Sequence, residues 1–197
     1  NTTATTTANI TARSLAVTIT ASNKTYDSST AASVTYADNR IAGDVFTVSG
    51  TATFATKTIG TGKTVTATGI TLTGTDAGNY TQNTTTTASA NIISRSLSVT
   101  ATAANKTYDR TTAASVSLSD NRVSGDTVSV TYSTSTFADK TVGTGKTVTV
   151  SGIAISGTDA GNYTVNTSTT TSADITARTL AVTITPMNKT YDGTDTA

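Results

Sequence analysis

Apolar and polar residues alternate along most of this chain, which is the pattern of half-buried β-strands. In Ser14–Thr20, Leu15, Val17 and Ile19 share one face, while Ser, Ala and Thr occupy the other. The alternating segments are separated by short turns rich in Gly, Asp and Asn. Further strands are therefore expected at Ala31–Tyr36, from Val45, at Thr51–Thr58, at Lys63–Thr73 and between Asn79 and Ile93.

The same pattern is written twice and begins a third time. Asn-Lys-Thr-Tyr-Asp occurs at Asn23–Asp27, Asn105–Asp109 and Asn188–Asp192, with steps of 82 and 83 residues. This period predicts tandem modules, which usually build length or valency rather than one active site. The predicted parts are the closing strand of a preceding repeat (1–9), repeat 1 (10–91), repeat 2 (92–174), and the opening strand and turn of a truncated third repeat (175–197).

The predicted fold class is all-β, with six to seven strands in each repeat and no significant helix. That number of strands in so short a repeat favours an Ig-like, two-sheet β-sandwich with antiparallel strands. A β-grasp-like repeat is the alternative, disfavoured because the sequence offers no helix to cover its sheet. The additional residue of repeat 2 falls between Asp126 and Phe137, where a loop or bulge is expected to absorb it. Thr84–Thr102, which joins the repeats, lacks Gly and Pro and predicts a short, stiff junction.

Composition supports strands and excludes several classes of function. Thr makes up about a quarter of the chain, and Glu, His, Cys and Trp are absent, which favours strands over helices. The regular alternation and the net charge of only +1 argue against a disordered coil. The lack of basic clusters argues against a nucleic-acid partner, and no apolar run is long enough to span a membrane. Low charge, abundant Thr and absent Cys favour an extracellular location.

The sequence offers few residues that could serve in catalysis or bind a metal. The chain has no His to serve as a base, and its twelve Asp residues lie mostly in predicted turns. We therefore expect that the protein is not an enzyme and carries no cofactor, with Ca²⁺ at a joint between repeats as the one candidate metal. Gly60–Thr64 and Gly143–Thr147 lack the first Gly of a phosphate-binding loop and lead into strands, so that both are predicted to be hairpin turns.

Three sets of side chains are candidates for special roles. The four Tyr residues at equivalent positions (Tyr26, Tyr80, Tyr108 and Tyr163) are expected to fill the core, with their hydroxyls bonded to the backbone. Candidate N-glycan acceptors in Asn-x-Ser/Thr are Asn23, Asn79, Asn83, Asn105, Asn162 and Asn166. Candidates for a Lys–Asn isopeptide cross-link, which needs a Lys, an Asn and an acid together in the core, are Lys24, Lys63, Asn79 and Asp27.

Several motifs in fixed order carry a family resemblance that covers essentially the whole chain. Lys-Thr-Tyr-Asp-Gly at Lys189–Gly193, Gly-Thr-Asp-Ala-Gly-Asn-Tyr at Gly74–Tyr80, and Val-Gly-Thr-Gly-Lys at Val142–Lys146 resemble the Tyr-Asp-Gly ("YDG") repeats of large bacterial surface proteins. The resemblance implies filamentous-haemagglutinin-like adhesins, with the modules as stalk or matrix-building repeats and no catalytic residues. Ser28 and Arg110 replace the Gly of the motif in the first two copies, which predicts that the turn does not require a positive φ.

The sequence thus predicts structural stalk or fibre repeats of an adhesin at the bacterial cell surface. The expected partners are neighbouring repeats of the same or identical chains. The terminal segments Asn1–Asn9 and Leu180–Thr185 are predicted to complete a neighbouring repeat by strand complementation. The alternative function is an adhesive module that binds a host or matrix glycan or protein through loop tips such as Asp38–Gly43 and Asp120–Gly125.

Overall fold

The structure is a computed structural model that describes residues 3–195. Over this range the chain forms β-strands and two single-turn 3-10 helices, η1 (Ala77–Asn79) and η2 (Ala160–Asn162), with no α-helix. The all-β prediction is confirmed, whereas the Ig-like sandwich stays a prediction. Chain contacts define two compact units, each described by itself. Among the described residues, unit 1 comprises 3–99, 120–131 and 153–167, and unit 2 comprises 100–119, 132–152 and 168–195.

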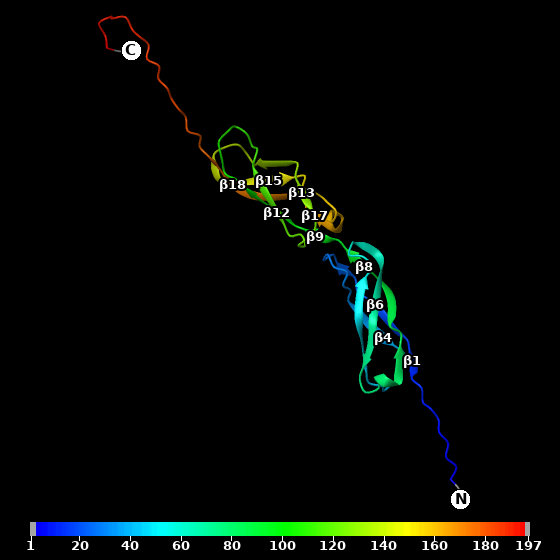
Figure 1. Cartoon of the computed structure of the whole chain (residues 1–197). Coiled ribbons are helices and arrows are strands. Elements are labelled where there is room, and N and C mark those ends of the chain that lie inside the picture. Colours follow the sequence, from blue (N-terminus) through cyan, green and yellow to red (C-terminus); the bar gives the residue numbers. More distant parts are fainter. Residues whose placement is uncertain (1–2, 196–197) are drawn as a thin grey trace. The chain divides into compact units, whose positions relative to one another are not determined.

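Repeat 1 supplies most of unit 1. Its strands are β1 (Arg13–Leu15), β2 (Val17–Ala21), β3 (Lys24–Thr25), β4 (Val34–Asp38), β5 (Thr47–Phe54), β6 (Gly60–Thr73), β7 (Tyr80–Gln82) and β8 (Thr85–Ile93). The largest sheet has the order β3-β8-β6-β5, and Figure 1 shows its strands β6 and β8 side by side. Strands β2 and β4 form an antiparallel pair outside this sheet. Within the sheet, β5 and β6 are also antiparallel.

Two strand pairs of repeat 1 are parallel, which corrects the expectation of antiparallel pairing. β1 runs parallel to β7, with Arg13 opposite Tyr80, and β3 runs parallel to β8, with Lys24 opposite Ile92. Both pairs join the beginning of the repeat to its end. The alternation pattern could not reveal this, because it reports which face a residue lies on and not the direction of the neighbouring strand.

The core of unit 1 follows the predicted faces. Leu15, Val17 and Ile19 are all buried, as expected from the alternation. On β6, Val65 and Ala67 are fully buried while Thr64 and Thr68 face solvent. The strand faces could therefore be predicted from the sequence, since a period of two fixes them once one residue of the strand is known to point inward.

Unit 1 also contains four strands of repeat 2. The other six strands of repeat 2 lie wholly or mostly in unit 2. The first group is β9 (Arg95–Leu97), β13 (Ser129–Thr131), β16 (Ala154–Ser156) and β17 (Tyr163–Val165). The second group is β10 (Val99–Ala103), β11 (Lys106–Thr107), β12 (Val116–Asp120), β14 (Thr134–Phe137), β15 (Gly143–Ser151) and β18 (Ser168–Thr176). In unit 2 the sheet order is β11-β18-β15-β14, and β11 runs parallel to β18.

The additional residue of repeat 2 lies where the sequence alignment of the repeats placed it. In repeat 1, only Gly50 separates Ser49 from Thr51 at a register shift of the β5–β6 ladder. At the corresponding point of repeat 2, Tyr132 and Ser133 separate β13 from β14. The extra residue is therefore absorbed where the strand is already irregular, so that the flanking registers are kept.

The segments Gly60–Thr64 and Gly143–Thr147 lie in the connections of the antiparallel pairs β5–β6 and β14–β15, as predicted, and they also begin the second strand of each pair. Gly60 is the first residue of β6 and Gly143 the first of β15. A register shift follows each of them, between Gly60 and Lys63 and likewise between Gly143 and Lys146. No helix follows either segment, so the backbone lacks the helix N-terminus that a phosphate-binding loop requires.

The turn after each Tyr-Asp pair does adopt a positive φ, contrary to the sequence-based expectation. Ser28 has a φ of 65°, Arg110 of 73° and Gly193 of 80°. All three copies therefore have the left-handed conformation, although only the third has Gly. A Cβ in this region crowds the backbone at a cost of about 1–2 kcal/mol per residue. Ser28 and Arg110 therefore lower the stability of the folded chain by about this amount relative to a residue without this strain.

We expect Arg110→Gly to stabilise the protein. The substitution removes the steric cost of the left-handed region, while the added freedom of Gly in the unfolded chain offsets part of the gain, leaving about 0.5–1 kcal/mol. The measurement is the free energy of unfolding of the full chain in urea. Arg110→Ala keeps a Cβ and is the control that should show no such gain. Equal effects of Gly and Ala would mean that φ does not limit stability here.

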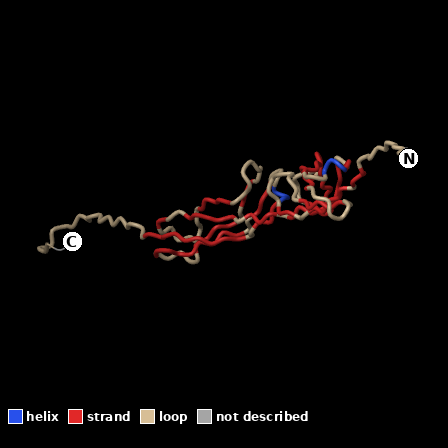
Figure 2. Tube along the Cα trace, turned by 90° about the horizontal axis from the view of Figure 1, so that it is seen from below, coloured by secondary structure: helices blue, strands red, loops and turns tan. Residues whose placement is uncertain are grey.

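The described parts of both ends are exposed and form no strand. Residues 3–12 and 177–195 have neither strand pairing nor burial, and Figure 2 shows both segments as loop. Leu180 is 83% exposed, whereas its counterpart Leu15 is 1% exposed. Strand complementation by these segments stays a prediction. Residues 1–2 of the predicted closing strand and residues 196–197 of the truncated repeat lie outside the described residues.

Candidate functional site

The Tyr-Asp turn, residues 23–29 in repeat 1, is organised around the ammonium group of Lys24. Its Nζ donates hydrogen bonds to Asp27 Oδ1 at 2.7 Å, to Ser29 O at 2.8 Å and to Ala31 O at 3.0 Å. Asp27 Oδ1 in turn accepts from the backbone N–H of Ser29 at 2.9 Å. The ammonium also lies 5.6 Å from the centre of the Phe54 ring. The Lys and the Asp of the motif therefore hold the turn closed.

Within unit 1, the Tyr26 side chain packs against a residue of repeat 2. The rings of Tyr26 and Tyr163 meet edge to face, with centroids 5.5 Å apart and an angle of 78°. Tyr26 is 0% exposed. Such aromatic pairs contribute about 0.5–1.5 kcal/mol beyond the area that they bury. The Tyr of the motif is thus the centre of a contact between consecutive repeats, which we call the joint.

Asp126 is the polar centre of the joint. Its Oδ2 accepts a hydrogen bond from the Tyr163 hydroxyl at 2.6 Å, and its Oδ1 accepts one from Ser28 Oγ at 2.8 Å. The Tyr163 hydroxyl also accepts from the backbone N–H of Val123 at 2.9 Å. Burial raises the pKa of Asp126, but hydrogen bonds from Tyr163 and Ser28 and the charge of Lys57 outweigh it, so the pKa is lowered.

We therefore expect the joint to be most stable near neutral pH. Burial and the hydrogen bond to Asp126 raise the pKa of Tyr163 to about 12. The stabilisation from the neutral Tyr163 phenol is complete below its unfolded pKa of about 10 and is lost as the pH rises toward the folded value. Because the pKa of Asp126 is lowered, its contribution is present above the unfolded pKa of about 4 and is lost as the pH falls through the folded one.

Lys57 brings a positive charge between two carboxylates of repeat 2. Its Nζ lies 3.3 Å from Asp159 Oδ1 and 3.8 Å from Asp126 Oδ1, and it donates to Ser28 Oγ at 3.1 Å. The hydrogen bond to Asp159 raises the pKa of Lys57. At the predicted position for Ca²⁺ the joint therefore holds an ammonium group. Within residues 3–195, no group of three or more His, Cys, Asp or Glu could hold a metal.

The covalent connection at the joint is as short as predicted. Only Ser94 separates β8 from β9, and β9 pairs at once with β17, with Arg95 opposite Tyr163. Beside this connection, Asn162 Oδ1 accepts a hydrogen bond from the backbone N–H of Ile59 at 3.1 Å. The joint thus combines a strand pair, an aromatic contact and a charge cluster. Its stiffness stays a prediction.

Comparison with protein families identifies the repeats. The family model described as the YDG domain matches residues 11–88 and, a second time, residues 93–172. The chain belongs to the YDG domain family. No curated protein and no solved structure matches it. The predicted resemblance to YDG-type repeats is thereby confirmed, including their arrangement in tandem.

Each letter of the YDG motif has a separate structural duty. In the first YDG domain, Tyr26 packs at the joint, Asp27 binds the ammonium of Lys24, and Ser28 occupies the position of the Gly with a positive φ. In the second domain the Lys106–Asp109 pair closes the same turn at 2.9 Å. The motif is therefore a structural device for making and presenting a turn.

The expectation for the Tyr residues is confirmed for two of them. Tyr80 and Tyr163 are buried, and each hydroxyl accepts a hydrogen bond from a backbone N–H, of Ile41 and Val123 respectively. Tyr26 is also buried, but its hydroxyl has no hydrogen-bond partner within residues 3–195. Tyr108 is only partly buried. The repeat pattern could not distinguish Tyr26 from Tyr108, because the difference depends on what packs against each turn.

The candidate glycan acceptors differ in the burial and the hydrogen bonds of their side chains. Asn162 is buried at 4% exposure, and the Nδ2 groups of Asn83 and Asn166 donate to the carbonyls of Val17 and Val99. Glycosylation of these three would break those contacts. Asn23, Asn79 and Asn105 are exposed, so that their amides are within reach of solvent.

The four isopeptide candidates do not assemble into a buried triad. Lys24 and Asp27 pair within the Tyr-Asp turn, where the Asp27 side chain is half exposed. Lys63 donates to the hydroxyls of Thr56 and Thr58, while Asn79 lies in η1 on the surface. These positions give the lysines turn-closing roles.

The loop tips at Asp38–Gly43 and Asp120–Gly125, which the alternative function as an adhesive module would use, carry charges that are paired within each loop. Arg40 forms an ion pair with Asp38, donates to the carbonyl of Phe46 at 2.6 Å, and lies 3.8 Å from the centre of its ring. In the second YDG domain Arg122 pairs with Asp120 in the same way.

Within residues 3–195, no helix is long and apolar enough to cross a membrane.

The sequence-based interpretation missed the members of the joint other than Tyr26 and Tyr163. The sequence predicts no special role for Lys57, and it predicts Asp126 and Asp159 only as turn residues. A signal was present, because Lys140, Asp44 and Asp76 stand at the equivalent positions of the other repeat. Recurrence alone, however, does not distinguish a residue kept for its own turn from one kept for the neighbouring repeat.

Proposed function

We propose that this chain is a run of structural spacer repeats from an extracellular bacterial adhesin or surface fibre, where it supplies length and mechanical stiffness. The joint is the observation that carries the proposal. A spacer must resist bending between modules, and here one linking residue, a buried aromatic pair and a charge cluster connect consecutive YDG domains. We propose no catalytic role, and the internally paired loop charges favour the spacer over an adhesive module.

The strand order within each domain also suits a load-bearing role. When the chain is pulled from its two ends, force enters a domain at its first strands and leaves through its last. The parallel pairs β1–β7 and β3–β8 connect these two regions in repeat 1. In a parallel pair of first and last strands, the pull loads all ladder hydrogen bonds in shear at once. Sheared bonds must break together, which demands more force than opening them one by one.

Single-molecule force spectroscopy on the full chain tests the proposal. We expect two unfolding events, one for each YDG domain, each releasing roughly 80 residues and therefore about 27 nm of contour length. Pulling one domain through a hairpin, with handles at Ala55 and Gly62, is the control and should require far less force. A similarly low force in both geometries would contradict a load-bearing role. Binding to a glycan array would instead favour the adhesive module.

A further inference from the structure

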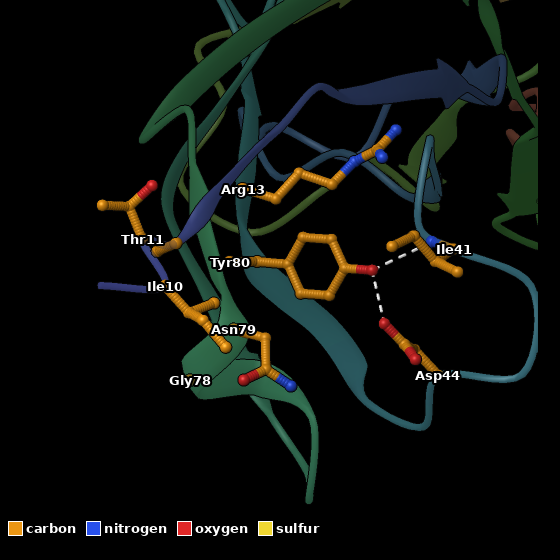
Figure 3. Close-up of a pocket in the computed structure, with 9 residues that line it drawn as sticks. Ile10, Thr11, Arg13, Ile41, Asp44, Gly78, Asn79 and Tyr80 are labelled. Atoms are coloured by element: carbon orange, nitrogen blue, oxygen red, sulfur yellow. Dashed lines mark hydrogen bonds between the residues drawn. The ribbon is translucent and has the colours of Figure 1, made fainter. Parts of the chain in front are cut away.

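A cavity of about 430 Å³ opens in the first YDG domain, lined by residues that include Arg13, Ile41, Asp44, Asn79 and Tyr80. Figure 3 shows the Tyr80 hydroxyl directed at Ile41 and Asp44. It accepts a hydrogen bond from Ile41 N at 2.9 Å and donates one to the Asp44 carboxylate. Nearby, the Asp76 carboxylate accepts from Val45 N at 2.8 Å. We call the group Ile41, Asp44, Asp76, Asn79 and Tyr80 the open socket.

The open socket has a filled counterpart in the same chain. The residues at the equivalent positions, 82 or 83 further on, are Val123, Asp126, Asp159, Asn162 and Tyr163. These residues receive the Tyr-Asp turn of repeat 1 at the joint. They also repeat the internal hydrogen bonds of the open socket, from Val123 N to the Tyr163 hydroxyl and from that hydroxyl to Asp126. The open socket therefore has its bound geometry before anything enters, which lowers the cost of binding.

The two sockets differ where the incoming turn makes its contacts. Asn162 is buried and its Oδ1 accepts from the backbone of Ile59, whereas Asn79 is exposed. Asp126 is likewise buried by Ser28 and Lys57, while Asp44 is only partly buried. The open socket thus presents an amide and two carboxylates, the groups that the filled socket uses to hold a Tyr-Asp turn.

The second YDG domain carries a matching turn. Tyr108, Arg110, Lys140 and Val142 are the counterparts of Tyr26, Ser28, Lys57 and Ile59. Arg110, Lys140 and Val142 are exposed, and Tyr108 is partly buried. At the positions that would face the socket, Arg110 replaces the neutral Ser28, so the second domain brings the cations Arg110 and Lys140 where repeat 1 brings only Lys57. The open socket offers Asp44 and Asp76 in return, which gives charge complementarity.

We propose that the open socket binds the Tyr-Asp turn of the second YDG domain in another copy of this chain. The inference rests on the proposed function, since it extends the same joint from one chain to two. In this arrangement Tyr108 meets Tyr80 edge to face, as Tyr26 meets Tyr163. Arg110 then pairs with Asp44, and Lys140 lies near Asp76. Residues 3–12 and 177–195 belong to no strand, so no ladder has to break as the turn enters.

Such a contact is heterologous, because it joins two different surfaces. Within residues 3–195, neither the turn of the second YDG domain nor the open socket has the partner surface seen at the joint. Copies that associate through these two surfaces add head to tail without closing. In a single chain the linker holds the turn of repeat 1 near the socket of repeat 2, at an effective concentration of the order of millimolar. Separate copies must reach comparable concentrations, so we expect association between about 0.1 and 1 mM.

Sedimentation velocity of the full chain over that range tests the proposal. We expect the weight-average sedimentation coefficient to rise with concentration. Lys140→Asp should abolish the rise, since it places a carboxylate against Asp76 and Asp44. Arg178→Asp makes the same change of charge at an exposed residue that belongs to no strand, and it should leave the rise intact. A chain that stays monomeric to about 1 mM, or one that both variants weaken equally, overturns the proposal.

Disulfide trapping supplies a second measurement, because the chain has no Cys of its own. At the joint, Ser28 and Asp126 are hydrogen bonded, so their counterparts Arg110 and Asp44 should come close enough for a disulfide. A mixture of Arg110→Cys and Asp44→Cys chains should give a crosslinked heterodimer on mild oxidation. Lys63→Cys mixed with Asp44→Cys should give much less.

Two results would point elsewhere. Equal crosslinking in both mixtures would overturn the proposal, as would association that requires residues 180–195 but not Lys140, since strand exchange would then be its basis. Failure here is distinguishable from failure of the proposed function. A chain that stays monomeric yet unfolds at high force in the pulling experiment overturns only the inference about copies.

Discussion

Tyr26→Ala should lower the free energy of unfolding by about 3–5 kcal/mol. The substitution empties a site where the side chain is fully buried and removes the edge-to-face contact with Tyr163. It also uncovers Asp126, whose hydrogen bond to Ser28 then lies in a wetter environment. The measurement is urea unfolding of the full chain followed by circular dichroism. We expect the loss in the transition that includes the first YDG domain.

Tyr26→Phe is the matched control and should cost almost nothing. The Tyr26 hydroxyl is buried without a hydrogen-bond partner within residues 3–195, and removal of such a group is neutral or slightly stabilising. Tyr108→Ala is a second control, expected to cost less than Tyr26→Ala because Tyr108 is only partly buried. If Phe proved as damaging as Ala, the hydroxyl and not the packed ring would hold the joint.

Gly157→Ala should destabilise the second YDG domain by about 3 kcal/mol or more, from backbone strain together with a steric overlap. Gly157 has a φ of 118°, and a Cβ there would lie 2.5 Å from the carbonyl oxygen of Thr127. The obstacle is backbone, which cannot move without disturbing the hydrogen bonds between Thr127 and Asp159. Thermal and urea unfolding both measure the effect. Gly74→Ala should act similarly in the first domain.

The same loop supplies the control for this prediction. Gly161 lies four residues after Gly157, has no positive φ, and a Cβ there meets nothing within 4 Å. Gly161→Ala should therefore change the free energy of unfolding by no more than about 0.5 kcal/mol. A large loss at Gly161, or none at Gly157, would contradict the assigned geometry of the Gly-Thr-Asp-Ala-Gly-Asn-Tyr turn.

Much of the fold could be predicted from the pattern of residues. The period identified the tandem modules, and the alternation placed Leu15 and Val17 in the core. Strand direction could not be predicted, because a parallel β3–β8 pair and an antiparallel one have the same alternation. The conformation of Ser28 and Arg110 was also predicted wrongly, since the absence of Gly was taken to mean the absence of a positive φ. Surrounding contacts hold a residue in a conformation that it would not choose alone.

The joint was harder to predict because its members are far apart in the sequence. Lys57 and Asp159 are separated by a whole repeat, and nothing local to either residue indicates the other. The candidate glycan acceptors show the same limit. Asn79 and Asn162 have the same sequence context, yet Asn79 is exposed and Asn162 is buried at the joint, where it accepts a hydrogen bond from Ile59 of the preceding repeat.

The three copies of the Tyr-Asp turn separate what the sequence determined from what tertiary structure decided. All three have the Lys–Asp ion pair, at 2.7 Å in the first copy and 2.9 Å in the others, even where the third lies in an exposed segment. The turn is therefore determined locally, because residues three positions apart supply both partners. Burial of the Tyr is not, since Tyr26 is 0% and Tyr191 93% exposed. Complete burial requires a second surface, which the neighbouring repeat provides for Tyr26.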